Sequence, residues 1–341
     1  MEKMRLGRTN LQVSRTSFGA LPIQRVPIEE AIILLQKAVE YGINFFDTAR
    51  MYTDSEEKLG QGLSKYRNDV ILATKSTARK GDELIRELEL SLKLLKTDYI
   101  DIYQCHFCRV LPLPDDGTYV YETLLKARDQ GKVRYIGITT HDVNVAIQGA
   151  KSGLYDTVQY PLSSLSVKRD LEIIPICKEN DVGLIAMKAM SGGLIRNKAA
   201  AFAFLRLHEN VVPIWGIQKM EELEEWISYE NNPPVLDEKL LNEIEKEKAE
   251  LGASFCRGCG YCQPCPVGIP IETAARMQLF LGRMPPELYT TSTWQQNMSL
   301  IDTCMHCDSC KSKCPYGLDT PALLAENNKF YKEYLIKHNI N

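Results

Sequence analysis

Two cysteine-rich segments near the end of the chain hold most of its thiols. The chain of 341 residues has eleven cysteines, and eight of them lie in the segments 256–266 and 304–315. The second segment has the C-x2-C-x2-C-x3-C-P spacing that is typical of a [4Fe–4S] site, and the first differs only in its last gap. Thiolates at every third residue can wrap one face of a cubane cluster, and the proline then turns the chain away. The two segments therefore predict two [4Fe–4S] clusters.

The fourth cysteine of each segment is expected to ligate the cluster of the other segment, as it does in two-cluster ferredoxins. One predicted ligand set is Cys256, Cys259, Cys262 and Cys314, and the other is Cys304, Cys307, Cys310 and Cys265. Zinc sites and disulfides are the alternatives. Zinc binds pairs of C-x-x-C ligands and has no use for triplets followed by Cys-Pro. Disulfides are less favoured, because nothing in the sequence marks a secreted protein.

Four polar residues in the first third of the chain form a second candidate site. Asp47, Lys75 and His106 each end a short apolar segment, and Tyr52 lies in the loop after Asp47. The ordinary pKa of tyrosine is about 10, and the charge of Lys75 is expected to lower it. Asp47 would keep Lys75 charged and oriented, and His106 would hydrogen-bond the substrate oxygen or share its proton. These residues predict carbonyl reduction, in which a hydride reaches carbon and Tyr52 protonates oxygen.

Strands and helices are predicted to alternate over roughly the first 230 residues. The strands are expected at 15–19, 43–46, 70–74, 99–105, 134–138, 157–160, 183–187 and 211–217. Such alternation implies a parallel sheet, and eight units fit a closed (β/α)8 TIM barrel better than an open doubly wound sheet. No G-x-G-x-x-G opens a helix, which also disfavours a Rossmann fold. The carboxyl ends of barrel strands face the active site, so the four polar residues should meet there.

A proline pair at 233–234 interrupts the last helix of the barrel and predicts a domain boundary. We expect the barrel at 1–232, a linker helix at 233–252 and a cluster domain at 253–341. Helical patterns at 271–282 and 320–337 make this last domain a mainly helical, ferredoxin-like iron-sulfur domain.

The composition excludes several classes of protein. A net charge of −3 at pH 7 predicts no binding to nucleic acid. The amino-terminal residues lack the apolar stretch of a signal peptide, and no apolar run is long enough to span a membrane. We therefore expect a cytoplasmic protein with unpaired thiols and no membrane partner.

The segments around the four polar residues resemble the signature of the aldo/keto reductases. The resemblance rests on 45–52, 55–60, 71–75 and 98–106 and extends over about residues 4–230. It implies that Asp47, Tyr52, Lys75 and His106 are the catalytic tetrad, with Tyr52 as general acid, and that the cofactor is NADH or NADPH. The whole chain is similar to the aldo/keto reductases that carry a C-terminal ferredoxin-like [4Fe–4S] domain.

The resemblance also implies a nicotinamide site, from which this sequence departs at several positions. Thr139 and Thr140 replace a Ser-Asn pair, Gln159 matches the glutamine that binds the carboxamide, and Met187 replaces a stacking tyrosine next to Lys188. The pyrophosphate loop corresponds to Gly192, Gly193 and Leu194, and the adenosine end to Gly216, Lys219, Glu222 and Glu225. Glu222 would repel the 2′-phosphate of NADPH. Three possibilities for the cofactor therefore stay open, which are NADPH, NADH and the loss of nicotinamide binding.

Cys105 and Cys108 flank His106 and resemble half of a metal site. Strand alternation argues against one, because Cys105 should point away from His106. Cys177 is expected to be a buried small hydrophobe.

Hydride transfer needs no iron, so three hypotheses explain the clusters. In the first, an aldo/keto reductase-like enzyme acts on a small-molecule carbonyl or alcohol, and its clusters exchange electrons with it or with a redox partner protein. In the second, an iron-sulfur electron-transfer or docking protein has a barrel that has lost nicotinamide-dependent turnover. In the third, the clusters are structural and hold the C-terminal domain over the barrel.

Overall fold

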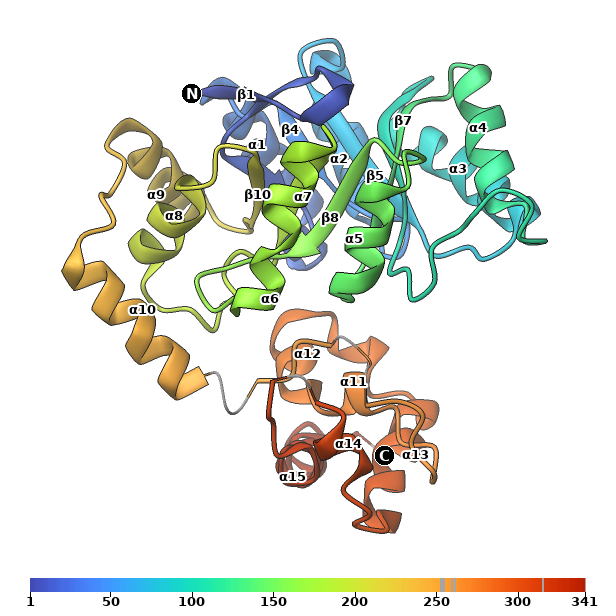
Figure 1. Cartoon of the computed structure of the whole chain (residues 1–341), viewed down its shortest axis with the longest axis vertical. Helices are drawn as coiled ribbons and strands as arrows, with labels where there is room; N and C mark the ends of the chain where they lie inside the picture. Colours follow the sequence, from blue (N-terminus) through green and yellow to red (C-terminus); the bar gives the residue numbers. More distant parts are fainter. Residues whose placement is uncertain (252–254, 259, 261, 315, 341) are drawn as a thin grey trace. The chain divides into compact units, whose positions relative to one another are not determined.

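Eight parallel strands close into a barrel in the first part of the chain (Figure 1). In order around the barrel they are β10 (Val211–Gly216), β3 (Ser17–Gly19), β4 (Phe45–Asp47), β5 (Ile71–Ser76), β6 (Ile100–Cys105), β7 (Val133–Thr139), β8 (Thr157–Pro161) and β9 (Gly183–Met187). Each strand lies beside its neighbour in the sequence, and β10 closes the ring against β3. The predicted (β/α)8 barrel is confirmed.

The structure is a computed structural model that describes residues 1–251, 255–258, 260, 262–314 and 316–340. It consists of two compact units, Met1–Ile244 and Glu245–Asn341. The finer division into a barrel at 1–232, a linker helix at 233–252 and a cluster domain at 253–341 stays a prediction.

Helices follow the barrel strands as the pattern predicts, except that one of them is divided. They are α1 (Ile28–Glu40), α2 (Ser55–Leu63), α3 (Gly81–Leu95), α4 (Val120–Asp129), α5 (Val143–Lys151), α6 (Lys168–Leu171), α7 (Ile173–Glu179), α8 (Lys198–Arg206) and α9 (Met220–Asn231). The divided helix is the one after β8, which consists of α6 followed by α7. Pro175 has no N–H to donate to the carbonyl four residues earlier, at Leu171, where α6 ends.

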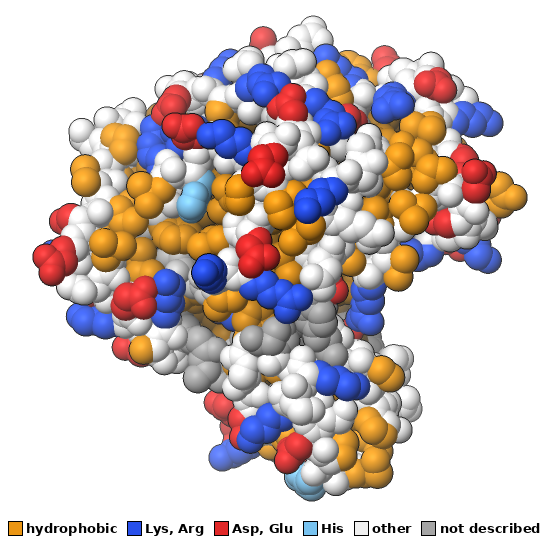
Figure 2. Space-filling model, viewed as in Figure 1, with side chains coloured by type: hydrophobic (Ala, Val, Ile, Leu, Met, Phe, Trp, Pro, Cys, Tyr) orange, Lys and Arg blue, Asp and Glu red, His pale blue; other side chains and the backbone are white. Residues whose placement is uncertain are grey.

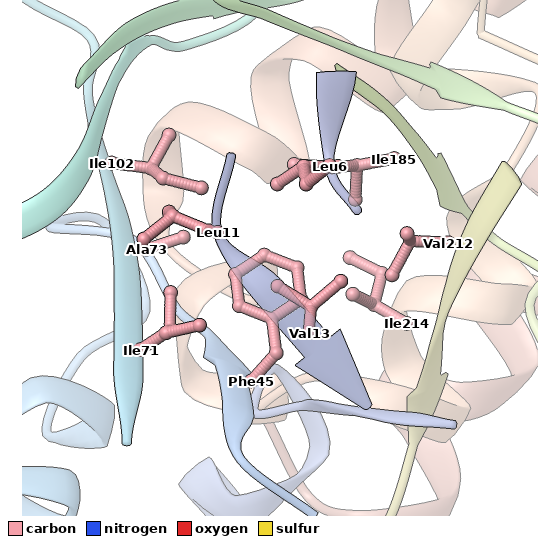
Figure 3. Packing of buried hydrophobic residues seen from close by; sticks show 10 residues of the cluster. All are labelled: Leu6, Leu11, Val13, Phe45, Ile71, Ala73, Ile102, Ile185, Val212 and Ile214. Atoms are coloured by element: carbon pink, nitrogen blue, oxygen red, sulfur yellow. The ribbon is translucent and has the colours of Figure 1, made fainter. Parts of the chain in front are cut away.

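An N-terminal hairpin closes the amino end of the barrel. Strands β1 (Lys3–Arg5) and β2 (Gln12–Ser14) pair in the antiparallel direction. Figure 3 shows Leu6, Leu11 and Val13 beside inward-facing side chains of the barrel strands, which are Phe45, Ile71, Ala73, Ile102, Ile185, Val212 and Ile214. Burial of these side chains stabilises this end of the barrel. The polar strand ends thus lie at the opposite, carboxyl end.

The second unit is helical, and its described residues include no strand. Its helices are α11 (Ile271–Ala274), α12 (Met277–Arg283), α13 (Ser292–Ser299), α14 (Ser309–Ser312) and α15 (Thr320–Lys337), while α10 (Glu238–Leu251) runs across the division between the units. Leu324 and Tyr331 of α15 are buried in its apolar core. The Tyr331 hydroxyl donates to the Tyr289 carbonyl at 2.7 Å. The mainly helical C-terminal region is as predicted.

The surface carries charges of both signs. In Figure 2, lysine and arginine side chains alternate with aspartate and glutamate over the face shown. Within the described part of the chain, no helix is long and apolar enough to cross a membrane.

Candidate functional site

A buried ion pair lies at the carboxyl end of the barrel. Asp47 is the last residue of β4, and Lys75 lies near the end of the adjacent strand β5. Lys75 Nζ donates to Asp47 Oδ1 at 2.6 Å and to the Thr48 carbonyl at 2.5 Å. The side chains are 1% and 3% exposed. Burial lowers the pKa of Lys75, and the charge of Asp47 opposes this shift.

Tyr52 and His106 stand next to this pair. Their ring centroids are 5.9 Å apart with an interplanar angle of 82°, and Lys75 Nζ lies 5.3 Å from the Tyr52 ring centroid. The four residues that the sequence singled out therefore converge, although they come from two strands, the loop after β4 and the turn after β6. Two of them can hold a proton near a substrate oxygen, and the other two form a charged pair beside the phenol.

The electrostatics of Tyr52 differ from the expectation. Burial, followed by the negative charge of Asp47, raises the pKa of Tyr52 above its ordinary value. The predicted lowering of this pKa is therefore wrong, because burial and the charge of Asp47, which lies 2.6 Å from Lys75 Nζ, raise it. The phenol consequently keeps its proton at neutral pH and is present as a donor.

His106 is neutral in this environment. Burial lowers the pKa of His106 well below its ordinary range, and the nearby charges of Lys75 and Arg79 lower it further. Its Nδ1 atom has no hydrogen-bond partner among the described residues. A neutral imidazole can both accept and donate a hydrogen bond, so His106 is suited to orient a carbonyl oxygen.

Two glutamines bond Asp47, and sequence reasoning did not predict this role for either of them. It named Gln159 only as a residue of the nicotinamide site, and it did not name Gln104. Gln104 Nε2 lies 3.5 Å from Asp47 Oδ2, and Gln159 Nε2 lies 3.3 Å from Asp47 Oδ1. Both amides are buried, and neither Oε1 has a partner among the described residues. Alternation along β6 gives the signal for Gln104, since it faces the same side as Ile102 and His106.

Arg79 is the second residue that sequence reasoning missed. Its Nη2 atom donates to the carbonyls of His106 at 2.8 Å and Phe107 at 3.1 Å. These bonds hold the turn that carries His106. No motif marks this arginine, which lies in the loop after β5.

The hydroxyls of Thr139 and Thr140 are already bonded within the barrel. Thr139 Oγ1 accepts from the Phe107 N–H at 2.9 Å, and Thr140 Oγ1 donates to the Cys108 carbonyl at 2.7 Å. Both threonines are buried. They therefore fix the segment that follows His106, whatever else they bind.

The end of β9 and the segment after it are the next part of the predicted nicotinamide site. Met187 packs against the apolar cluster inside the barrel. Lys188 has a φ of 56°, and Gly192 and Gly193 have φ values of 76° and 81°. The two glycines adopt this left-handed backbone without steric cost. Gly193 is exposed, whereas Leu194 is half-buried.

The acidic residues after β10 are engaged as helix cap and ion-pair partner. Glu222 Oε2 accepts from the N–H groups of Gln218 at 2.8 Å and Lys219 at 3.2 Å, at the start of α9. Glu225 forms an ion pair with Lys198 and accepts from the Tyr229 hydroxyl at 3.0 Å. Gly216 and Lys219 are exposed at this edge.

A hollow in the second unit is lined by thiols from both cysteine segments. Its empty volume is about 420 Å³, part of it open to solvent, and its wall includes Cys262, Cys265, Cys304, Cys307 and Cys310. The set Cys304, Cys307, Cys310 and Cys265 thus shares one wall, which fits the chemistry of a thiolate-bound cluster. Within the described ranges, no group of three or more His, Cys, Asp or Glu side chains lies close enough together to hold a single metal ion.

The other predicted ligand set is described only in part. Cys256 and Cys262 pack against the apolar core of the second unit, and Cys314 is half-buried. The Gly258 N–H donates to Cys256 Sγ at 3.4 Å, the kind of bond that tunes cluster sulfurs. Cys259 lies outside the described residues.

Two family models match this chain, one in each of its two regions. A model of the aldo/keto reductase family matches residues 15–201, which is more than half of the chain. The chain belongs to the aldo/keto reductase family. A second model, described as a 4Fe-4S dicluster domain, matches residues 255–319. The family and the iron-sulfur region predicted from the sequence are confirmed, and the protein is an oxidoreductase.

Relatives of this aldo/keto reductase match part of its length. It is 31% identical to an uncharacterized oxidoreductase, YqkF, of Bacillus subtilis over 58% of this chain and 68% of that protein. It is 32% identical to the L-galactose dehydrogenase of Arabidopsis thaliana over 57% of this chain and 67% of that protein. An aldo-keto reductase from Klebsiella pneumoniae, solved in complex with NADPH, matches with a TM-score of 0.62 and 21% identity over 72% of this chain and 94% of that one, which shows the shared fold.

Proposed function

We propose that the barrel interconverts a small carbonyl compound and its alcohol by nicotinamide hydride transfer, with Tyr52 as general acid. The observation that carries this proposal is the convergence of a protonated phenol, a neutral imidazole and a buried Lys–Asp pair at the carboxyl end of the barrel. In TIM barrels this end holds the active site.

The proposed roles follow from the geometry of the chain's own groups. Tyr52 donates its proton to the carbonyl oxygen, and His106 orients that oxygen through a hydrogen bond. As negative charge develops on the phenol oxygen, the ammonium group of Lys75, 5.3 Å from the centre of the ring, stabilises it. Positioned proton transfer of this kind contributes about 10²–10⁴-fold to a rate. A reduced nicotinamide, when bound, supplies the hydride.

The residues present fit such a cofactor. The unpartnered Oε1 of Gln159 can accept from a carboxamide NH₂ beside Asp47. Thr139, Thr140, Met187 and Lys188 border the same strand ends, and Gly192, Gly193 and Leu194 offer an open turn to a pyrophosphate. Gly216, Lys219, Glu222 and Glu225 are proposed for the adenosine end.

Charge at Glu222 is expected to set the choice between the two nicotinamides. Glu222→Gln removes the charge and keeps an oxygen that can cap α9, so it should raise the affinity for NADPH relative to NADH by about tenfold. Glu224→Gln is the control, since Glu224 is an exposed residue of the same helix. Both affinities are measured by quenching of protein fluorescence. An equal ratio in the variant and the wild type would remove Glu222 from the site.

We also propose two [4Fe–4S] clusters that exchange electrons with the barrel's chemistry or with a redox partner protein. The ligand sets are Cys256, Cys259, Cys262 and Cys314, and Cys304, Cys307, Cys310 and Cys265. The hollow lined by five of these cysteines supports a cluster at the second set.

Iron counting tests both the number of clusters and the exchange of the fourth ligands. The anaerobically purified protein should hold about eight iron atoms per chain. If the sets are right, Cys265→Ala with Cys304→Ala removes one cluster and leaves about four irons, whereas Cys265→Ala with Cys314→Ala removes nearly all iron. Cys177→Ala, at a buried thiol of the barrel, should lose none. Loss of nearly all iron from both double variants would show that each segment binds its own cluster, because each pair then removes one ligand from each cluster.

A second candidate function is an electron-transfer or docking protein whose barrel has lost nicotinamide turnover. It is favoured by the bonds that already occupy Thr139, Thr140, Glu222 and Glu225. Anaerobic turnover separates the two candidates. We expect NADH or NADPH to be consumed when small aldehydes and ketones are added to cluster-loaded protein. Binding of neither nicotinamide, together with rapid reduction of the clusters by a ferredoxin-type donor, would favour the second.

A further inference from the structure

Two thiols flank the catalytic turn and have no part in the proposed carbonyl chemistry. Cys105 ends β6, His106 and Phe107 form the centre of a turn, and Cys108 follows it. Phe107 adopts a φ of 55°, which tightens the chain at this point. Both cysteines are buried, with exposures of 1% and 4%.

The turn brings the two side chains close together. Cys108 Sγ lies 3.4 Å from the carbonyl oxygen of Cys105, so the thiol points back across the turn. The end residues of such a turn have Cα atoms less than about 7 Å apart, which is within the range that a disulfide can bridge. The neighbouring bonds of this segment keep it in place, since the Cys108 N–H donates to the Thr139 carbonyl at 2.7 Å.

The environments of the two sulfurs differ. A hydrogen bond from the Cys105 thiol lowers the pKa of Cys108, and the positive charge of Arg79 acts in the same direction. The same contact, together with burial, raises the pKa of Cys105 well above its ordinary value. Paired thiols in which one is the better thiolate are typical of C-x-x-C redox centres. Cys177, by contrast, is a lone thiol whose pKa burial raises to about 12.

We propose that Cys105 and Cys108 form a redox-active dithiol–disulfide couple that reacts with low-molecular-weight disulfides. The Cys108 thiolate attacks one sulfur of the reagent and releases the first thiolate. Cys105 then attacks the Cys108 sulfur of the mixed disulfide and releases the second. Two protein thiols are oxidised, the reagent is reduced to two thiols, and the two protein protons pass to the released thiolates.

The couple acts on the catalytic turn itself. A Cys105–Cys108 disulfide encloses His106 and Phe107 in a small ring. The Cys108 thiol must leave the carbonyl of Cys105 to form it. If the proposed function holds, oxidation therefore displaces the His106 imidazole and lowers carbonyl turnover reversibly. The disulfide itself forms whether or not the barrel turns over carbonyls.

Tryptic mapping tests the couple directly. The fragment Thr97–Arg109 contains both thiols and no internal lysine or arginine. Full-length, cluster-loaded protein is equilibrated without oxygen in glutathione buffers of increasing disulfide fraction, quenched in acid, denatured, alkylated and digested. We expect the fragment to lose both labels together and, when unlabelled, to be about 2 Da lighter than the dithiol form. The fragment with Cys177 should stay fully labelled throughout.

Single replacements distinguish the roles of the two thiols. Cys105→Ser should stop at one glutathione adduct on Cys108, and Cys108→Ser should leave Cys105 fully labelled by the alkylating reagent. Retention of both labels on the wild-type fragment at high disulfide fraction would overturn the proposal. A wild-type fragment that stops at a glutathione adduct would overturn it as well. Since these readouts are masses, they are independent of the result for carbonyl turnover.

Discussion

Tyr52→Phe should lower the rate of carbonyl reduction by about 10²–10⁴-fold, because it removes the only proton that Tyr52 can give to the substrate oxygen. The phenol is half-buried beside Asp47 and keeps its proton, so the loss reflects a missing donor. The ring itself is kept, and with it the edge contact with His106 at 5.9 Å. Nicotinamide affinity should therefore change little, and single-turnover rates under anaerobic conditions measure the effect on the chemical step.

Tyr119→Phe is the matched control for this substitution. Tyr119 is 68% exposed. Because this substitution removes the same hydroxyl group from a site on the surface, the variant should reduce carbonyls at the rate of the wild type. If Tyr52→Phe also kept a rate close to that of the wild type, another group would have to be the acid, and the proposed role of Tyr52 would be wrong.

Lys75→Met should both abolish turnover and destabilise the barrel by about 3–5 kcal/mol, because it leaves Asp47 charged and without its cation in the interior. The two side chains are 1% and 3% exposed, so water cannot replace the lost partner. Lys75 also bonds the Thr48 carbonyl at 2.5 Å, which the methionine leaves unpaired. Urea unfolding followed by circular dichroism of the barrel measures the loss.

A double variant separates the two effects of this substitution. Asp47→Asn in the Lys75→Met background removes the uncompensated charge, so stability should return in large part while turnover stays absent. Arg86→Met is the control for the loss of an ion pair alone, since Arg86 and Asp82 are 67% and 68% exposed and 3.1 Å apart. This control should lose little stability. An equal loss for Lys75→Met and Arg86→Met would contradict a buried, structural ion pair.

The barrel and the meeting of the four catalytic candidates could be predicted from the sequence, for a physical reason. Each strand is a short apolar run, and the polar residue at its end marks the edge where parallel strands share one face. Asp47, Lys75 and His106 obey this rule, and the structure brings their side chains together around Tyr52.

The features of the site that could not be predicted from the sequence depend on distances between side chains. The shift of the Tyr52 pKa was predicted in the wrong direction, since burial of the phenol and the nearby charge of Asp47 raise it. Gln104 and Arg79 went unnoticed because each acts on a residue from another strand or turn. The expected helix at 271–282 is divided into α11 and α12, a break between residues 274 and 277 that no proline or glycine marks.

The measurement that tests the central claim most directly is the transfer of deuterium from the cofactor to the product. Cluster-loaded protein is incubated without oxygen with NADH or NADPH that carries deuterium at C4 of the nicotinamide, and with a small aldehyde. We predict that deuterium appears on the former carbonyl carbon of the alcohol, and that Tyr52→Phe prevents this. An alcohol formed without deuterium from either C4 face would mean that its electrons arrive by another route, and the barrel would not be a nicotinamide hydride-transfer enzyme.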